Sequence, residues 1–152
     1  MSTPHFDDVY ADDPWLSIRW DKERKCVHAE WKGFANSVQF RDGTLKILGA
    51  LRDKHAAFLI SDNRRLEGVV DADQLWLRDS WVPAAVAGGL TRIGVVVARR
   101  GLGKIASEEI VGRFVKTAFA TRTFDSLEDA TDWLVAETTP IGYATRRRVP
   151  FA

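Results

Sequence analysis

The segment Thr91-Arg-Ile-Gly-Val-Val-Val-Ala98 carries the strongest strand signal in this chain of 152 residues. Upstream of it, Ala57-Phe-Leu-Ile60 is a short continuous apolar run, which is typical of a strand buried on both faces. Between the two runs, Asp71-Ala-Asp-Gln74 has the form of a capping box and predicts the start of a helix. Because β-α-β crossovers are right-handed and join parallel strands, we expect these two strands to be parallel.

The connection between the two strands is predicted to contain two short helices. The first runs through residues 75–77 and stops before Pro83, because proline removes a backbone donor and clashes with the preceding turn. The second begins with Pro83 in its first turn and ends at Gly88-Gly89. We therefore expect a kink before Pro83, flanked by Trp76 and Trp81.

Upstream of this unit, the sequence predicts a hairpin and a helix. Residues 15–20 and 26–32 alternate with a period of two and are rich in β-branched and aromatic residues, which is typical of two paired strands. Trp20 and Trp31 are candidates for a pair across this hairpin. From Ser37 to about Lys54 the apolar residues recur at helical spacing, so a helix follows.

Downstream, the sequence predicts a helix, a strand and a second helix. Ser107 with Glu108 and Glu109 is expected to open the first helix, since acidic side chains favour the positive end of its dipole. Thr121-Arg-Thr-Phe124 predicts a short strand, and Ser126 a cap for the last helix. The buried stripe of that last helix is predicted to consist of Leu127, Ala130, Trp133 and Leu134.

Together these elements predict one α/β domain with a single open mixed sheet and the order β-β-α-β-α-β-α-β-α. The domain spans residues 15–138. Residues 1–14 are polar and acidic and are interpreted as a flexible arm, and residues 139–152, with Arg146-Arg-Arg148, as a tail. With all crossovers of one hand, we expect the helices to lie largely on one face of the sheet.

The amino-acid composition limits the classes of protein to which this chain can belong. Hydrophobic residues make up 45% and charged residues 28%, as in ordinary soluble globular domains. Lys and Arg total 22 against 21 for Asp and Glu, which leaves no global field to attract nucleic acid or an anionic membrane. The longest apolar run, residues 93–98, is far shorter than the roughly 20 residues that span a bilayer, and no secretory signal is expected. With a single cysteine, Cys26, we expect no internal disulfide, no Cys-based zinc site and a cytoplasmic location.

Several local patterns carry a resemblance to a known fold family. They are Trp31-Lys-Gly33, residues 59–66, Asp73-Gln-Leu-Trp76 with Trp81-Val-Pro83, Gly89-Leu-Thr-Arg92, and residues 124–134. With the element order, residues 15–136 resemble STAS-like domains (sulfate transporter and anti-sigma-factor antagonist), and more closely a bacterial group of STAS/SEC14-like domains. The resemblance implies a protein-interaction or regulatory module, and the related lipid-exchange fold implies binding of hydrophobic ligands.

One departure from that family concerns regulation. In anti-sigma-factor antagonists, a partner kinase phosphorylates a serine at the start of the helix that follows the third strand. The matching stretch here, Val70-Asp-Ala-Asp73, has no hydroxyl group. Asp71 at the expected N-cap and Asp73 in the first turn make this position permanently acidic. We therefore expect no phosphorylation at this helix, including at the nearest hydroxyls, Ser61 and Ser80.

A first group of candidate residues could bind a ligand or a partner. Residues 62–65 lie at the carboxyl end of a central strand, where open α/β sheets bind ligands, and paired arginines can hold a carboxylate or phosphate. The same arginines could instead pair with nearby aspartates. The two tryptophans that flank the kink could line a cleft or a dimer surface. The group comprises Asp62, Asn63, Arg64, Arg65, Asp71, Asp73, Trp76 and Trp81.

A second group could bind an anion. Gly101-Leu-Gly-Lys-Ile-Ala106 matches the pattern G-x-G-x-x-A between a strand and a helix, where backbone N–H groups can cradle phosphate. Asp125 occupies the place of a ribose-binding acid. The alternative is a purely structural connection, because this is not the first βα turn and Asp125 is explained as part of a helix start. The anion-binding candidates are Arg99, Arg100, Gly101, Gly103 and Lys104.

No catalytic residue, cofactor or metal is predicted. His5, His28 and His55 lack metal-ligand spacing, and Cys26 is interpreted as a buried, inert thiol. The sequence therefore predicts a non-enzymatic regulatory or protein-interaction module, expected to be a homodimer with a possible protein partner. The alternative is a binding protein for a small hydrophobic or anionic ligand, lipid-like or nucleotide-like. A filled interface between sheet and helices would favour the first function, and an apolar cavity of several hundred cubic ångströms the second.

Overall fold

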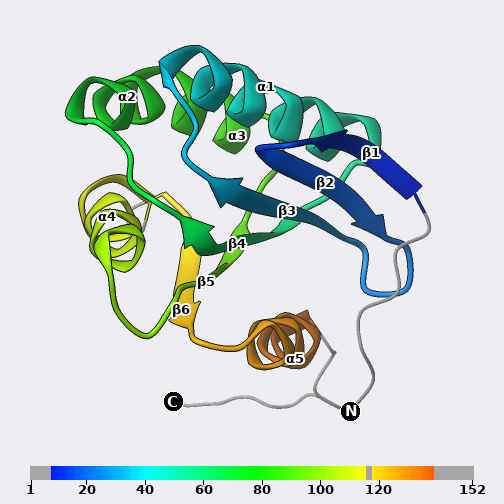
Figure 1. Cartoon of the computed structure of the whole chain (residues 1–152). Helices are drawn as coiled ribbons and strands as arrows, with labels where there is room; N and C mark the ends of the chain where they lie inside the picture. Colours follow the sequence, from blue (N-terminus) through cyan, green and yellow to red (C-terminus); the bar gives the residue numbers. More distant parts are fainter. Residues whose placement is uncertain (1–7, 116–117, 139–152) are drawn as a thin grey trace.

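A computed structural model of the chain describes residues 8–115 and 118–138 and contains one six-stranded mixed sheet (Figure 1). The strands lie in sequence order across the sheet; the first three are antiparallel, and the third to the sixth are parallel. They are β1 (Asp8–Asp13), β2 (Leu16–Asp21), β3 (Cys26–Gly33), β4 (Phe58–Leu66), β5 (Arg92–Val96) and β6 (Ala120–Phe124). The predicted tail, with Arg146-Arg-Arg148, lies outside the described residues.

Helical segments connect the parallel strands and follow the last one. Two of them, η1 and η2, are π-helical. In chain order the segments are α1 (Ser37–Asp53), α2 (Asp71–Trp76), η1 (Leu77–Trp81), α3 (Val82–Ala87), α4 (Leu102–Ile110), η2 (Val111–Val115) and α5 (Leu127–Thr138). In the described part of the chain, none of these helices is long and apolar enough to cross a bilayer.

Most of the helices lie on one face of the sheet, as expected, but α5 covers part of the opposite face. Figure 1 shows α1, α2 and α3 on one side and α5 on the opposite side. The reason is that β4 and β5 are apolar on both faces. Leu59 and Ile93 join the larger core under α1–α4, whereas Ile60 and Val96 join a smaller core with Leu134 of α5.

The first strand also departs from the prediction, because part of the expected flexible arm is the edge strand β1. It pairs antiparallel with β2, with a bulge between Val9 and Ala11. Its acidic side chains reach lysines of neighbouring elements, as in the Asp13–Lys46 pair at 3.3 Å. Charged side chains on an edge strand also discourage pairing with other chains. Residues 1–7 lie outside the described residues.

The helix α1 begins and ends where the sequence predicts. Asn36 and Gln39 form a reciprocal capping box: Gln39 N–H donates to Asn36 Oδ1 at 2.9 Å, and Asn36 N–H donates to Gln39 Oε1 at 3.0 Å. On the strand before it, Trp31 lies opposite Leu16 in the register, not opposite Trp20. The expected pair across the hairpin is therefore wrong.

Two other helix starts differ from the prediction. The N-cap of α2 is Val70, which makes no side-chain cap, so the capping box expected at Asp71 is wrong. The helix α4 begins after Gly101, and Ser107 is buried inside it rather than opening it. The predicted cap of the last helix is confirmed, since Ser126 Oγ accepts the Asp129 N–H at 3.2 Å.

The first connecting helix does not stop before Pro83. The wider turn of η1 continues it, with the Val82 N–H donating to the Leu77 carbonyl five residues back, and α3 follows with Pro83 in its first turn. The π-helical turn gives the proline ring room that an α-helical turn would deny it. The predicted end of this segment at Gly88-Gly89 is confirmed.

Candidate functional site

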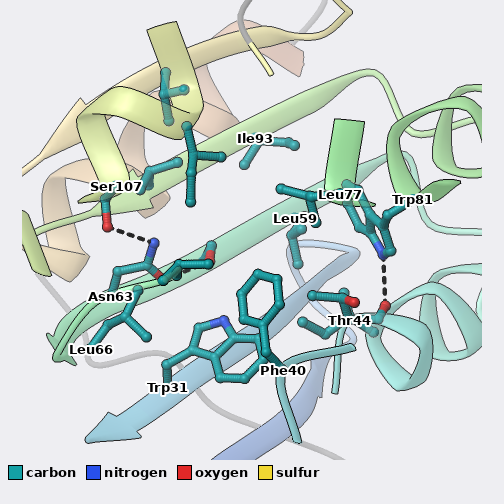
Figure 2. A pocket seen from close by; sticks show the side chains of 16 residues that line it. Trp31, Phe40, Thr44, Leu59, Asn63, Leu66, Leu77, Trp81, Ile93 and Ser107 are labelled. Carbon is teal, nitrogen blue, oxygen red and sulfur yellow. Dashed lines mark hydrogen bonds between the residues drawn. The ribbon is translucent and has the colours of Figure 1, made fainter. Parts of the chain in front are cut away.

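A mostly apolar cavity of about 80 Å³ lies between the sheet and the helices of the larger core (Figure 2). Trp31 and Phe40 form one wall, and their rings stack with centroids 5.3 Å apart. Ile93 of β5 lies on the opposite side (Figure 2), and Ile110 of α4 also lines the cavity. Such walls favour an apolar occupant, because transferring apolar surface out of water is favourable.

One end of the cavity is polar. Ser61 and Asn63 alternate onto the same face of β4, and Ser107 faces them from α4 (Figure 2). Ser61 Oγ donates to Asn63 Oδ1 at 2.8 Å, and Asn63 Nδ2 donates to Ser107 Oγ at 3.1 Å. Because amide and hydroxyl groups both donate and accept, this end can recognise one polar group of a ligand.

Both π-helical segments contribute to the cavity wall. Leu77 and Trp81 come from η1, and Val111 comes from η2. The buried Trp81 ring is fixed by a hydrogen bond from its Nε1–H to the Thr44 carbonyl at 2.6 Å. Single π-helical turns are frequent at functional sites, so their position favours this cavity as the candidate site.

The two tryptophans expected to form a common rim have different environments. Trp81 is buried in the cavity wall, whereas Trp76 is half-buried under the Arg41 guanidinium, 5.4 Å from the ring centroid. Trp76 does not contribute to the cavity. The predicted aromatic rim is therefore reduced to Trp81.

The alternative that residues 64–65 pair with the aspartates of α2 is not what the structure shows. Arg64 instead makes two hydrogen bonds to Asp62, at 2.9 and 2.6 Å, which raise the pKa of its guanidinium. Arg65 Nη1 lies 3.7 Å from Glu30 Oε2. The reason is that β4 extends through residue 66, so these side chains are fixed beside their own strand and β3.

The aspartates of α2 differ in exposure. Asp71 is exposed, but Asp73 is buried and accepts hydrogen bonds from Ser37 Oγ at 2.8 Å and Arg41 Nε at 2.9 Å. Asp73 therefore joins α1 to α2. It does not contribute to the permanently acidic surface that the sequence predicted.

Replacing Asp73 with alanine is expected to lower the free energy of unfolding by about 2–3 kcal/mol, because it removes charge-assisted hydrogen bonds to Ser37 and Arg41. Asp71→Ala, on the exposed side of the same helix turn, should cost less than about 1 kcal/mol. Urea unfolding of both variants measures the difference. Equal losses would contradict the assigned role of Asp73.

The two groups of candidate residues meet at a surface groove of about 400 Å³. From the first group, Arg64 and Arg65 line it, and from the second group, Arg100, Gly101, Gly103 and Lys104. Arg99 does not line the groove and pairs with Asp125 at 3.4 Å, which gives this aspartate a structural partner. Anion binding in the groove stays a prediction.

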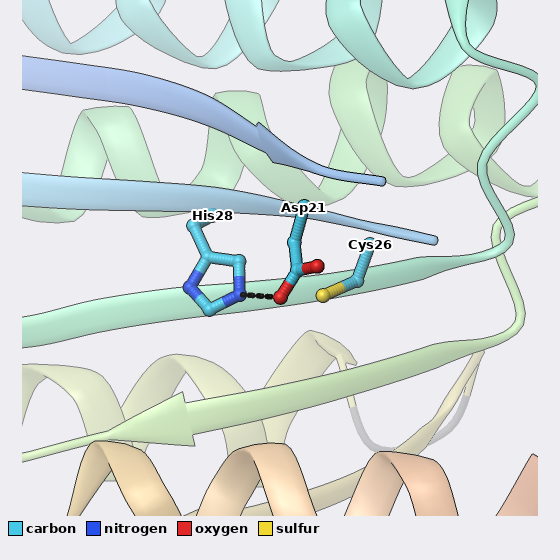
Figure 3. A group of neighbouring side chains, drawn as sticks. All are labelled: Asp21, Cys26 and His28. Carbon is cyan, nitrogen blue, oxygen red and sulfur yellow. Dashed lines mark ion pairs between the residues drawn. The ribbon is translucent and has the colours of Figure 1, made fainter. Parts of the chain in front are cut away.

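A third arrangement escaped the sequence analysis. Asp21, Cys26 and His28 lie together on the face of the sheet opposite α1 (Figure 3). All three are buried: burial lowers the pKa of His28 to about 4 and raises the pKa of the Cys26 thiol far above its usual range. Neither Cys26 nor His28 alone has a sequence pattern that indicates a shared site. The sequence nevertheless contains a signal for this cluster. Strand alternation places residues 26 and 28 on one face of the sheet, and the hairpin pairs Asp21 with Cys26.

A scan against protein-family models and a search of curated protein sequences both find no match to this chain.

Proposed function

We propose that the chain is a STAS-like, non-enzymatic binding module that holds a small, mostly apolar molecule between its sheet and helices. The observation that carries this proposal is the cavity with apolar walls and one hydrogen-bonding end, formed by Ser61, Asn63 and Ser107 (Figure 2). Ligand sites commonly have this composition, with apolar surroundings and a few placed polar groups that fix orientation.

The size of the cavity limits the ligand. A volume of about 80 Å³ exceeds the roughly 30 Å³ that one water molecule occupies, but it lies below the roughly 300–1,000 Å³ of sites for drug-sized molecules. The proposed ligand is therefore a molecule of a few non-hydrogen atoms with one polar group, such as a short alcohol. A whole lipid or nucleotide is too large for this cavity.

A route into the cavity follows from the contact between α2 and α4. Gln74 of α2 donates from Nε2 to the Val69 carbonyl at 3.1 Å and to Glu109 of α4 at 3.0 Å. Its buried Oε1 has no hydrogen-bond partner among the described residues. An unsatisfied buried acceptor lowers the stability of the folded protein by about 1–3 kcal/mol. When α2 moves away from α4, water can hydrogen-bond to Gln74 Oε1. This gain offsets part of the free energy needed to open the cavity.

The helices α2 and α4 also carry exposed apolar side chains, through which ligand binding can regulate contact with a partner. Apolar side chains are exposed near the starts of α1, α2 and α4, all at the carboxyl edge of the parallel strands; they are Phe34, Val38, Val70, Leu75, Leu102 and Ile105. A ligand that shifts α2 relative to α4 changes the surface these side chains offer to a partner. This supports a ligand-controlled interaction module, and homodimerisation stays a prediction of the sequence.

Titration with 1-butanol, followed by amide NMR signals, tests the proposal. We expect saturable shifts in β4, β5 and α4, where the cavity-lining residues lie. Val111→Phe should abolish them, because Val111 contributes to the cavity wall. Val86→Phe makes the same change at an exposed position of α3 and should leave binding intact.

A second variant tests the polar end. Ser107→Ala removes one hydroxyl and should weaken 1-butanol binding about tenfold, the equivalent of one hydrogen bond. Binding of xenon, which needs no hydrogen bond, should be unchanged. Shifts that do not saturate, or that are equal in the wild type and Val111→Phe, would contradict the proposed function.

A further inference from the structure

The cluster of Asp21, Cys26 and His28 lies outside the cavity, and the proposed function does not use it. Asp21 ends β2 and lies directly opposite Cys26 in the antiparallel register, and His28 follows two residues along β3. Figure 3 shows the three side chains directed toward one another. We infer that this cluster is a zinc-binding site, with Asp21 Oδ2, Cys26 Sγ and His28 Nε2 as its donor atoms.

The donor set and its spacing fit zinc. Four-coordinate zinc takes sulfur at about 2.3 Å and imidazole nitrogen and carboxylate oxygen at about 2.0 Å, which separates the donor atoms by about 3.3–3.6 Å. His28 Nε2 lies 3.9 Å from Asp21 Oδ2, and one donor atom from each residue lies within 4.8 Å of the others. Small side-chain rotations bring such a set to zinc distances. Calcium and magnesium are excluded by chemistry, because both prefer oxygen donors alone.

Burial makes the cluster unlike a chance grouping of surface side chains. The exposed fractions of Asp21, Cys26 and His28 are 0%, 1% and 6%. Charged and polar groups are rarely placed together at such depth unless they are paired or bind a metal ion.

Zinc binding changes the protonation of one group and the partner of another. The Cys26 thiol must lose its proton to solvent as the sulfur–zinc bond forms, so one proton is released for each zinc ion bound. Asp21 already accepts from Arg24, at Oδ1 from the backbone N–H at 3.0 Å and at Oδ2 from Nη1 at 3.2 Å. Zinc competes with the Arg24 guanidinium for Asp21 Oδ2 only. The guanidinium keeps its ion pair with Glu23, whose Oε1 lies 3.7 Å from Arg24 Nη1.

The three donors leave one position of a four-coordinate zinc ion without a protein ligand. Three protein donors are typical of zinc sites that keep one position for water or a small ligand. His28 also lines a polar pocket of about 120 Å³, together with Arg19, Glu30, Asp62 and Arg64. This pocket therefore adjoins one of the three donor residues.

Cobalt(II) is the probe that tests this inference, because it occupies tetrahedral zinc sites and absorbs visible light. Cys26 is the only cysteine in the sequence, so a thiolate-to-cobalt charge-transfer band can come from no other residue. We expect one cobalt ion per full-length chain, with this band in the near ultraviolet. Added zinc should then bleach the band by displacing cobalt.

Variants assign the other donors. Cys26→Ser should remove the band, and His28→Gln should weaken cobalt binding more than about 100-fold, beyond the effect of losing an outer-shell partner. His55→Gln, at an exposed position elsewhere, should bind like the wild type. Absence of the band in the wild-type protein would overturn the inference whether or not the variants fold. A band that persists unchanged in folded His28→Gln would overturn it as well.

Discussion

Replacing Gly103 with alanine should lower the free energy of unfolding by more than about 3 kcal/mol. The new Cβ would lie 1.8 Å from the Leu66 carbonyl oxygen and 2.9 Å from its carbon. Overpacking against movable side chains typically costs about 1–3 kcal/mol, and here the obstacle is the backbone of β4. Since a domain is stable by only about 5–15 kcal/mol in total, this loss is a large fraction of its stability.

Gly49→Ala is the matched control for this substitution. Gly49 lies inside α1, and a Cβ built there meets no other atom within 4 Å. Alanine should therefore stabilise the helix by about 0.5–1 kcal/mol. Chemical unfolding of both variants measures the contrast. A Gly103→Ala protein as stable as the wild type would show that α4 does not approach β4 this closely.

Replacing Trp81 with alanine should cost about 3–5 kcal/mol, the range for deleting a large buried aromatic side chain. The ring is 4% exposed, contacts Phe119 edge-on at 6.4 Å between centroids, and donates to the Thr44 carbonyl. Trp81→Phe keeps most of the buried area but loses the donor, so about 1–2 kcal/mol is expected. Thermal or urea unfolding of the two variants measures these losses.

The same variant enlarges the proposed ligand cavity, because Trp81 forms part of its wall. Apolar cavities made by such deletions bind small aromatic molecules, so indole should restore part of the stability of Trp81→Ala. Indole should not stabilise Trp76→Ala, since the half-buried Trp76 does not contribute to the cavity. If indole stabilised neither variant, or both equally, Trp81 would not form part of the cavity wall.

Local patterns predicted the centre of the fold well. The run at residues 91–98 and the run at 57–60 are both strands, because continuous apolar segments bury on two faces whatever surrounds them. The acidic strand β1 was missed, since its pairing depends on lysines and a strand edge that are distant in sequence. The π-helical turn before Pro83 was missed because hydrophobic periodicity does not report a single widened turn.

The candidate sites were predicted less completely. Asn63 and Trp81 were named from the sequence and do line the cavity, but Asp73 lies inside a contact between helices. The side of a short helix that faces inward depends on how the helix packs against the rest of the fold. Because Asp73 is a charged residue in such a helix, nothing in its neighbouring sequence indicates that it is buried. The partnership of Asp21, Cys26 and His28 depends on strand register, which single-residue arguments do not use.

A crystal structure of the protein with 1-butanol tests the central claim most directly. The proposed function predicts one butanol molecule in the cavity beside Ile93, with its hydroxyl group within hydrogen-bond distance of Asn63 or Ser107. A cavity closed by rearranged side chains, or butanol bound only at the protein surface, would contradict it.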